Sequence, residues 1–499
     1  MFVHHLIYQG MADAIAFRGV NNVTYAQLQE EVAKYRTYFY QIGIRSGDNI
    51  GLFSRNSVEY VCSYMAIASL GAVVVPFNFQ LTCREIAYIV KDACMKHIVT
   101  AEPLNIAEEL HRYGYRQEVR QSLISDIKQQ ISQIGEMTPS FDNRLQEDQP
   151  CVIIYTSGTT GNPKGAVLSH KNLVANAGGL QKVLDISAQD NVLCVLPMYH
   201  CFAWTCAVLN PLLCGASITV LEAFAPKEAL AAIKDYGVTV MYGVPPIYNL
   251  LTRVGTPEDL QGIRLLVSGG ASLPENVARQ FRQKYGKTVT EGYGLSEASP
   301  VVTLNPAGKT KFCSIGKALP GLEVRVVNSK GETLPPGEVG ELIVKGHTVM
   351  QGYFNLPLET SLALRDGWLY TGDLAYQDTE DYLFIVDRLK DMIISNGENI
   401  YPREIEELLH SYPGIIEAAV VGQADELRGQ AVCAYIVMAP DQAFDKKALK
   451  AYLQGNLAAY KMPRDFVAVD ALPKNQTGKI LKRVLRDQFT KDANDARVG

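Results

Sequence analysis

The sequence has no uninterrupted apolar run long enough to cross a bilayer, for which about 20 residues are needed. Its first residues also lack a positively charged stretch followed by a long apolar run, so we expect no signal peptide. No basic block stands out and the formal net charge is −5, which argues against nucleic acid as the main partner. We therefore expect a cytoplasmic protein without a transmembrane segment.

None of the ten cysteines forms a C-x-x-C pair. Most of them lie in apolar runs, which predicts buried thiols in a reducing compartment rather than disulfides or zinc ligands. One group of cysteines is close together in the sequence but lacks the spacing of a metal site, so we interpret it as core packing. This group consists of Cys194, Cys201, Cys206 and Cys214.

The 499 residues are too many for one hydrophobic core, so two or three domains are expected. The first 145 residues alternate helical and strand-like segments, and the alternation resumes with strand-like runs near 192–196, 216–221, 238–242 and 263–267. This order is typical of an α/β fold, with sheets flanked by helices. Each of three later runs ends in a turn, near 197–200, 243–246 and 268–271, and ligands of open α/β sheets bind beyond such strand ends.

Three stretches depart from this alternation. Residues 102–150 are polar and are expected to form a surface excursion. Residues 313–388 contain short strands with Gly and Pro turns, which predicts a β-rich subdomain. From Lys390 onward the pattern is that of a small α+β domain, in which Pro402 opens a helix with apolar residues at helical spacing.

The segment 155–165, Tyr-Thr-Ser-Gly-Thr-Thr-Gly-Asn-Pro-Lys-Gly, is the richest local signal. It follows an apolar run, 151–154, that is typical of a buried strand, and it precedes Ser169, a candidate helix N-cap. Glycines allow close approach of the backbone, and amides, hydroxyls and a lysine suit phosphate oxygens. The alternative is a polar surface turn. The segment is not a Walker A loop, because Pro163 precedes Lys164 and Gly165 follows it, and a G-x-G-x-x-G dehydrogenase turn is also missing.

Together with this segment, four further stretches resemble the adenylate-forming superfamily of acyl-CoA synthetases, amino-acid adenylation domains and luciferases. The resemblance covers nearly the whole chain, in the family's order and spacing. The four stretches are Glu-Gly-Tyr-Gly-Leu-Ser-Glu at 291–297, Tyr-Thr-Gly-Asp at 370–373, Asp-Arg-Leu-Lys-Asp at 387–391 with Asn-Gly-Glu-Asn-Ile at 396–400, and Pro-Lys-Asn-Gln-Thr-Gly-Lys at 473–479.

This resemblance implies an ATP-dependent acid–thiol ligase that uses Mg²⁺ and coenzyme A. A carboxylate attacks the α-phosphate of ATP to give an acyl-adenylate and pyrophosphate, and a thiol then displaces AMP. Lys479 resembles the catalytic lysine, Glu297 the magnesium ligand, and Thr156 and His200 complete the catalytic set. The residues implied to bind ATP or AMP are Thr156, Ser157, Gly158, Thr159, Thr160, Gly161, Lys164, Gly270, Ala271, Ser272, Glu291, Gly292, Tyr293, Gly294, Leu295, Ser296, Asp373, Ile385, Arg388 and Lys479.

Each of the charged residues also has a plainer interpretation. Glu297 fits a glutamate in the first turn of a helix, and Asp373 fits an aspartate in a turn after Gly372. Lys479 fits a solvated lysine near the end of the sequence. Their motif neighbours favour the functional interpretation in each case.

The resemblance further implies an N-terminal domain over residues 1–388, with the β-rich subdomain inside it, and a mobile C-terminal domain over 389–499. Lys390 lies at the family's hinge, and a rotation about it would withdraw Lys479 after adenylation. The loop at 395–401 would then close a tunnel for the thiol, with Asn396, Gly397 and Glu398 beside coenzyme A.

The stretch between Pro197 and Leu221 contains no Asp, Glu, Lys or Arg. Relatives that activate amino acids place an acid here, and relatives that activate malonate use an arginine nearby. Because an unpaired charge is costly to bury, the resemblance implies an uncharged, apolar acyl tail. The residues expected at the acyl pocket are His200 as a lid, Phe202, Trp204 as an aromatic gate, Gly243 and Gly269; core packing explains Phe202 and Trp204 equally well.

The sequence therefore predicts an acyl-CoA synthetase for a medium- or long-chain fatty acid. The alternatives are an aryl-acid CoA ligase and a stand-alone enzyme that loads an acyl carrier protein; luciferase-like oxygenation is a rarer activity of the family. The sequence leaves a homodimer open.

Overall fold

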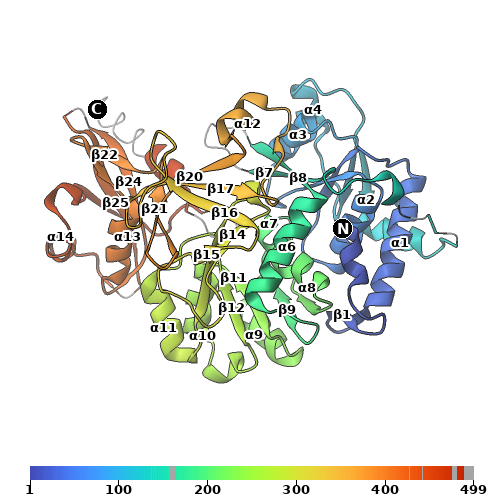
Figure 1. The fold of residues 1–499 in the computed structure, drawn as a ribbon, viewed down its shortest axis with the longest axis horizontal. Helices are drawn as coiled ribbons and strands as arrows, with labels where there is room; N and C mark the ends of the chain where they lie inside the picture. The colour runs from blue at the N-terminus through green and yellow to red at the C-terminus, as the bar shows by residue number, and fades with distance from the viewer. Residues whose placement is uncertain are drawn as a thin grey trace.

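The computed structural model describes the whole chain except residues 136, 139, 141, 157–162, 426, 441, 475–479 and 488–499. Within the described residues the strands form four sheets, of nine, seven, five and five strands. In Figure 1 the segment after about residue 390, in orange and red, gathers at one end of the molecule. This mixed α/β architecture, with a large N-terminal part and a small C-terminal part, confirms the predicted fold class.

The nine-stranded sheet contains the strand-like runs predicted between residues 191 and 268. Its central strands pair in parallel and are buried along most of their length, which explains their continuous Val, Leu and Ile runs. From edge to edge the strands are β15 (Lys317–Ala318), β14 (Val301–Leu304), β13 (Val289–Gly294), β12 (Leu265–Ser268), β11 (Val240–Gly243), β9 (Asn191–Cys194), β10 (Ser217–Val220), β1 (Ile15–Arg18) and β2 (Val23–Thr24).

Side-chain caps fix the starts of several helices. Ser169 accepts a hydrogen bond from the backbone N–H of Asn172, as its position in the sequence predicted, and Thr24 caps its helix in the same way. Pro402 opens its helix as expected, with Ile405 and Leu409 buried. The helices are α1 (Tyr25–Gln41), α2 (Val58–Ser69), α3 (Cys83–Asp92), α4 (Ala107–Arg112), α5 (Ile124–Ile131), α6 (His170–Leu184), α7 (Cys201–Ala203), α8 (Asn210–Leu213), α9 (Pro226–Asp235), α10 (Pro245–Val254), α11 (Glu275–Tyr285), α12 (Pro357–Ala363), α13 (Pro402–Ser411) and α14 (Lys446–Gln454), with a π-helical segment at Trp204–Leu209.

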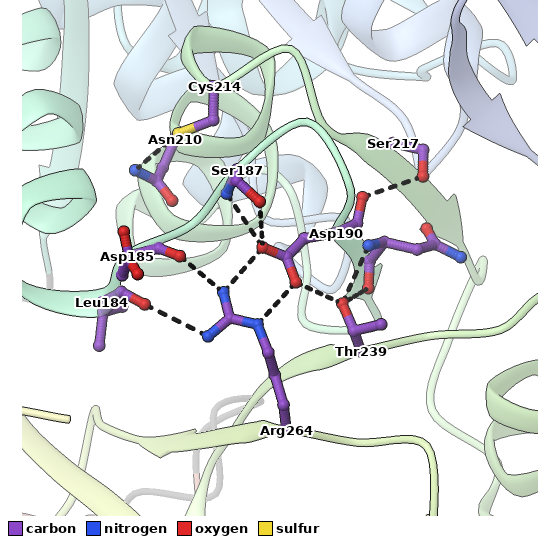
Figure 2. Close-up of polar contacts among 10 residues, drawn as sticks. Leu184, Asp185, Ser187, Asp190, Asn210, Cys214, Ser217, Thr239 and Arg264 are labelled. Carbon is purple, nitrogen blue, oxygen red and sulfur yellow. Dashed lines mark hydrogen bonds and ion pairs between the residues drawn. The ribbon is translucent and has the colours of Figure 1, made fainter. Parts of the chain in front are cut away.

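A buried carboxylate joins the amino ends of adjacent strands in the nine-stranded sheet (Figure 2). Asp190, which directly precedes β9, accepts two hydrogen bonds of 2.7 Å from the guanidinium of Arg264, which directly precedes β12. It also accepts one of 2.8 Å from Thr239, which directly precedes β11. Its backbone carbonyl accepts from Ser217 at the start of β10. One residue therefore holds four strand beginnings together, at the end of the sheet opposite to the predicted site.

The seven-stranded sheet contains the strands on both sides of the 155–165 segment. Its strands in order are β18 (Gly352–Tyr353), β8 (Lys164–Ser169), β7 (Pro150–Thr156), β4 (Val73–Pro76), β3 (Asn49–Phe53), β5 (His97–Thr100) and β6 (Arg120–Leu123). β7 and β8 are antiparallel, with Thr156 opposite Lys164, so the segment connects the two strands of a hairpin.

The expectation that residues 102–150 form only a surface excursion was wrong in part. β6 joins the seven-stranded sheet as an edge strand, and α5 buries Ile127 and Ile131 in the main core. An edge strand packs on fewer neighbours, and β6 buries only Ser122, so its polar residues concealed a strand.

The β-rich stretch forms a five-stranded sheet. The strands are β16 (Leu322–Val327), β17 (Gly340–Gly346), β20 (Trp368–Gln377), β19 (Leu364–Arg365) and β21 (Leu383–Arg388).

The last sheet belongs to the C-terminal part and has its own apolar core, which includes Ile405 and Leu409 of α13 with Val420 and Ile436 of the sheet. Its strands are β23 (Glu398–Ile400), β22 (Ile393–Ser395), β25 (Gly429–Met438), β24 (Ile415–Asp425) and β26 (Asp465–Ala468). Asn396 and Gly397 both have positive φ angles, 52° and 81°, and connect β22 to β23 as a two-residue hairpin turn.

Across the residues that the structure describes, no helix combines the length and the apolar character needed to span a membrane. The cysteines are free thiols. Cys194, Cys201 and Cys206 are buried, which agrees with core packing, whereas Cys83 and Cys94 are exposed.

Candidate active site

A cleft of about 1330 Å³ separates the C-terminal part from the carboxyl ends of the large sheet. On one side it is lined by residues after β12, by β13 and by the strands β20 and β21. On the other side it is lined by α13 and by residues 480–487. The predicted ATP-binding residues that line it are Gly270, Ala271, Ser272, Glu291, Gly292, Tyr293, Gly294, Leu295, Asp373, Ile385 and Arg388.

The turn after β12 lines the cleft on the side of the large sheet. Gly270 adopts a φ of +77°, which favours glycine and lets the chain leave the strand sharply. The preceding Gly269 has no room for a side chain, because a Cβ atom there would lie 2.9 Å from the ring of Phe202. The turn therefore lies directly against the segment predicted to border the acyl group.

Glu291, on β13, is a buried carboxyl group in the wall of the cleft. It is 3% exposed, and one oxygen accepts a 3.0 Å hydrogen bond from the backbone N–H of Leu273. Burial raises its pKa to about 7, and the positive charge of Arg403 in α13 only partly opposes this shift. Glu291 therefore titrates near neutral pH at the boundary between the two parts of the chain.

Tyr293, Asp373 and Arg388 form one hydrogen-bonded group. The Tyr293 hydroxyl donates a 2.6 Å hydrogen bond to Asp373, and Nε of Arg388 lies 3.4 Å from the other carboxylate oxygen. Asp373 and Arg388 face each other across the antiparallel pair β20 and β21. Burial and then the charge of Asp373 raise the pKa of Tyr293 well above its usual range, so this hydroxyl remains a donor.

A second group surrounds Glu297, which lies in a short 3₁₀ turn. Its carboxylate accepts a 2.8 Å hydrogen bond from the hydroxyl of Tyr353. The ammonium of Lys164 lies 5.6 Å from the centre of the same tyrosine ring. Thr156 pairs with Lys164 across the hairpin, and its hydroxyl donates to the Lys164 carbonyl at 3.4 Å. Three predicted residues from two separate motifs, 155–165 and 291–297, thus lie together at the hairpin end.

The predicted acyl residues lie on and around α7. His200 caps this helix, because its Nδ1 accepts from the backbone N–H of Phe202. The thiol of Cys201 lies 3.3 Å from the hydroxyl of Ser296, so α7 contacts the Tyr-Gly-Leu-Ser motif. Gly243 makes room for the ring of Tyr248, which would lie 3.0 Å from a Cβ atom.

Trp204 is buried among other aromatic rings. It is 3% exposed, begins the π-helical segment and packs against Tyr64, with ring centres 4.1 Å apart, and against Tyr60. Trp204 thus has the surroundings of a core residue. Like the other predicted acyl residues, His200, Phe202, Gly243 and Gly269, it does not line the cleft.

The predicted hinge and tunnel residues lie in different surroundings. Lys390 lines the cleft, where burial and then the charge of Arg388 lower its pKa. Asn396, Gly397 and Glu398 are exposed at the tip of the β22–β23 hairpin and do not line the cleft. The predicted residues Ser157, Gly158, Thr159, Thr160, Gly161 and Lys479 lie outside the described residues.

Two residues of the site carried no recognised motif. Tyr353 contacts Glu297, but it lies on the two-residue strand β18, whose pairing with β8 joins segments distant in the sequence. Arg403 donates to the backbone carbonyl of Ile385 at 2.6 Å, although only Pro402 marked its neighbourhood in the sequence. Both residues are placed by contacts with segments distant in the sequence, which no local pattern indicates.

Nucleotide-motif residues in a cleft between a large α/β part and a small α+β part define an enzyme that activates an acid with ATP. The family model for the AMP-binding enzyme matches residues 7–354, and that for the AMP-binding enzyme C-terminal domain matches residues 404–479. The chain therefore belongs to the AMP-binding enzyme family, within the adenylate-forming superfamily, and is an ATP-dependent acid–thiol ligase.

Relatives of known activity match almost end to end. The chain is 35% identical to a feruloyl-CoA synthase from Amycolatopsis sp, over 94% of this chain and 95% of the relative. It is 34% identical to a long-chain-fatty-acid–CoA ligase from Bacillus subtilis, over 96% and 92%. It is 32% identical to the fatty acid–[acyl-carrier-protein] ligase ScoC from Streptomyces coeruleorubidus, over 98% and 96%.

A solved structure supports the same fold and adds information on conformation. ATP-bound MatB from Rhodopseudomonas palustris superimposes with a TM-score of 0.92, at 30% identity, over 98% of this chain and 99% of that one. The TM-score to apo MatB is 0.81 over the same shares. The arrangement of this chain is therefore closer to the ATP-bound one.

Proposed function

We propose that this ligase is an acyl-CoA synthetase for an apolar, uncharged carboxylic acid, with a medium- or long-chain fatty acid as the favoured substrate. It would convert the acid and ATP into an acyl-adenylate and pyrophosphate, and then transfer the acyl group to the thiol of coenzyme A with release of AMP.

The observation that carries the proposal is the absence of charge around α7. Residues 201–212 are buried, and no Asp, Glu, Lys or Arg occurs between Pro197 and Leu221. A second carboxylate or an ammonium on the substrate would find no permanently charged partner on this stretch, and an unpaired buried charge is strongly unfavourable. The apolar wall therefore supports an acyl tail without charge.

The residues of the cleft have separate roles in adenylation. Asp373, which contacts Tyr293 and Arg388, would accept hydrogen bonds from the ribose hydroxyls. The turn Gly270–Ser272 and the strand β13 supply the wall for the adenine and the α-phosphate. Lys164 and the hydroxyl-rich hairpin hold the outer phosphates, which leave as pyrophosphate. Lys479 would stabilise the negative charge that develops between the carboxylate and the α-phosphate.

Magnesium fits the surroundings of Glu297. Among the described residues no group of three or more His, Cys, Asp or Glu side chains could hold a metal, so a structural metal cage is not formed there. A single carboxylate near a phosphate loop is instead the donor set that Mg²⁺ uses together with substrate phosphates. Bound there, the ion would neutralise part of the phosphate charge and orient the triphosphate. Glu297 is the protein ligand in this proposal.

For the second half-reaction, we propose that the C-terminal part turns about Lys390. The exposed hairpin at Asn396–Glu398 would then come to the cleft and border the thiol path. The thiol sulfur attacks the acyl carbon, and the bond from that carbon to the AMP oxygen breaks. An acyl carrier protein remains the alternative thiol donor.

An aryl-acid CoA ligase is the second candidate, and one observation favours it. Aromatic rings lie at α7 beside the turn after β12, with Phe202 edge-on to Tyr242 at 6.1 Å between ring centres and in contact with Gly269. Such rings suit a flat aromatic substrate as well as an alkyl chain. The 35% identity to feruloyl-CoA synthase supports the same alternative.

Carboxylate-dependent ATP–pyrophosphate exchange across fatty, aryl and amino acids tests the proposal. We expect exchange with medium- or long-chain fatty acids, followed by AMP release on addition of coenzyme A. Preference for hydroxycinnamic or benzoic acids would favour the aryl-acid ligase, and exchange with amino acids alone would refute both. Release of AMP with a carrier protein but not with coenzyme A would show that the thiol acceptor is the carrier protein.

A further inference from the structure

Tyr353 is tied to the strand that leaves the phosphate hairpin. It lies on β18, opposite Ala166 of β8, and β8 begins at Lys164. The next residue, Phe354, donates its backbone N–H to the carbonyl of Gly165 at 2.7 Å. The backbone N–H of Tyr353 donates to the hydroxyl of Thr360 at 2.9 Å. The tyrosine backbone is therefore fixed relative to the end of the hairpin.

The side chain of Tyr353 contacts two charged groups of opposite sign. Its hydroxyl donates to Oε1 of Glu297 at 2.8 Å, and its ring lies beneath the ammonium of Lys164 at 5.6 Å. A tyrosine hydroxyl has an ordinary pKa of about 10, so it keeps its proton at neutral pH and can donate to the carboxylate. The backbone of Glu297 is also anchored to this segment, because its carbonyl accepts from the N–H of Met350 at 2.8 Å.

We infer that Tyr353 is a positioning residue for adenylation: its hydroxyl orients the carboxylate of Glu297 and its ring supports the ammonium of Lys164, so that both face the triphosphate together. The inference rests on the proposed function, in which Glu297 binds magnesium and Lys164 binds phosphate. It adds a residue that touches neither ligand and acts through both groups.

The physical reason lies in the cost of ordering flexible side chains. Glutamate and lysine lose rotamer freedom when they bind an ion or a phosphate. A hydrogen bond to a carboxylate is stronger than a neutral one, and it holds Oε1 while the other oxygen remains available to a cation. Groups that orient a metal ligand in this way commonly change metal affinity or activity by about 10–100-fold when they are removed.

The Tyr353→Phe variant tests the inference, because it deletes the hydroxyl and keeps the ring. In the full-length protein we measure exchange as a function of free Mg²⁺, with the carboxylic acid that supports exchange in the wild type. The half-saturating Mg²⁺ concentration should rise about tenfold or more. The KM for the carboxylic acid and the melting temperature should stay near the wild-type values.

Tyr115→Phe is a matched control, since this tyrosine hydroxyl donates a 2.7 Å hydrogen bond to the carbonyl of Met95, away from the cleft. It should leave the Mg²⁺ dependence unchanged. A double-mutant cycle with Glu297→Gln provides a second readout, because the effect of Tyr353→Phe should largely disappear once the carboxylate is gone.

The outcomes separate the inference from the proposed function. If Tyr353→Phe retains the wild-type Mg²⁺ dependence, or loses activity only in step with its melting temperature, Tyr353 is structural and the inference is wrong. The exchange activity of the wild type would still support the function. If the wild type shows no exchange with any carboxylic acid, the proposed function itself fails.

Discussion

The guanidinium of Arg403 donates a 2.6 Å hydrogen bond to the backbone carbonyl of Ile385. Arg403 belongs to α13, after the proposed hinge, whereas Ile385 lies on β21, before it. The backbone N–H of Arg403 also donates to the carboxylate of Asp387 at 2.9 Å. These bonds cross the cleft wall next to the predicted nucleotide pocket. A rotation of the C-terminal part about Lys390 would have to break them.

Arg403→Ala should therefore impair the adenylation step selectively. A hydrogen bond from a charged group contributes about 1.5–3 kcal/mol, which corresponds to about a tenfold or larger change in the population of this arrangement. We expect single-turnover formation of acyl-adenylate to slow by about tenfold, with thioester formation from supplied acyl-adenylate unchanged or faster.

The control for this variant is Arg464→Ala. Arg464 pairs with Asp425 at 2.6 Å, and both residues lie after Lys390, so this bond moves with the C-terminal part. It should affect the two half-reactions equally, if at all. If Arg403→Ala slowed both half-reactions equally, Arg403 would stabilise the fold in general and not the arrangement in which it bonds to Ile385.

Glu291→Gln should alter the pH dependence of stability. The folded-state pKa of about 7 lies above the ordinary value of 4.5, so the folded protein favours the protonated carboxyl. The contribution of this carboxyl group to the free energy of unfolding is fully present below pH 4.5. It is lost as the pH rises through 7, by up to about 3 kcal/mol. Glutamine resembles the neutral form. The variant should thus be more stable than the wild type at pH 8 and similar to it at pH 4.5.

Urea unfolding at several pH values checks this expectation, with the exposed Glu338→Gln as a control for the loss of one negative charge. A stability difference between wild type and Glu291→Gln that stays constant from pH 4.5 to 8 would show that Glu291 does not titrate in this range.

The parts of the fold that were predicted from sequence are those with a strong local cause. Ser169 begins a helix because its own hydroxyl satisfies a backbone N–H three residues later. The strand residues 192–194 and 240–243 carry no charged or amide side chain because both sheet faces are covered. The motif residues Gly270, Tyr293 and Asp373 converge because they follow or lie on strands that meet at the cleft.

The parts that sequence did not provide depend on distant pairing. Tyr353 acquires its position from β8, almost 200 residues earlier in the chain. Whether Trp204 faces a substrate or the core is not encoded locally, because both surroundings are apolar; its packing against Tyr60 and Tyr64 depends on α2. The turn at Asn396 and Gly397 did carry a local hairpin signal, which the resemblance to a mobile loop obscured.

Asp190→Asn tests the structural role of the bond network in Figure 2. The side chain of Asp190 is 5% exposed. Burial alone would raise its pKa, but hydrogen bonds from Arg264, Ser187 and Thr239 together lower it. We expect the free energy of unfolding to fall by about 2–3 kcal/mol, because the paired carboxylate is lost while its partners stay. The KM values of the folded protein should not change, since the network lies at the amino ends of the strands.

The pH dependence has a defined sign. Because the folded-state pKa of Asp190 is below the ordinary 3.8, its contribution is present above that value and is lost as the pH falls further. The difference in the free energy of unfolding between the wild type and Asp190→Asn should therefore become smaller only below about pH 4. Asp185→Asn is the control: Asp185 has a φ of 50°, which asparagine tolerates, and its contact to Arg264 uses the backbone carbonyl. If Asp185→Asn lowered the free energy of unfolding as much as Asp190→Asn, the structural role assigned to the Asp190 carboxylate would be contradicted.

Lys390→Pro should produce the opposite kinetic signature to Arg403→Ala. Proline fixes φ near −65° and restricts the residue before it, so a hinge at Lys390 could no longer change its backbone angles. We expect thioester formation from supplied acyl-adenylate to fall by about tenfold or more, and adenylate formation by less than about threefold. Lys390→Ala removes the same charge but retains backbone freedom, and it should leave the ratio of the two rates near that of the wild type. Equal losses in both half-reactions for Lys390→Pro would place the hinge elsewhere.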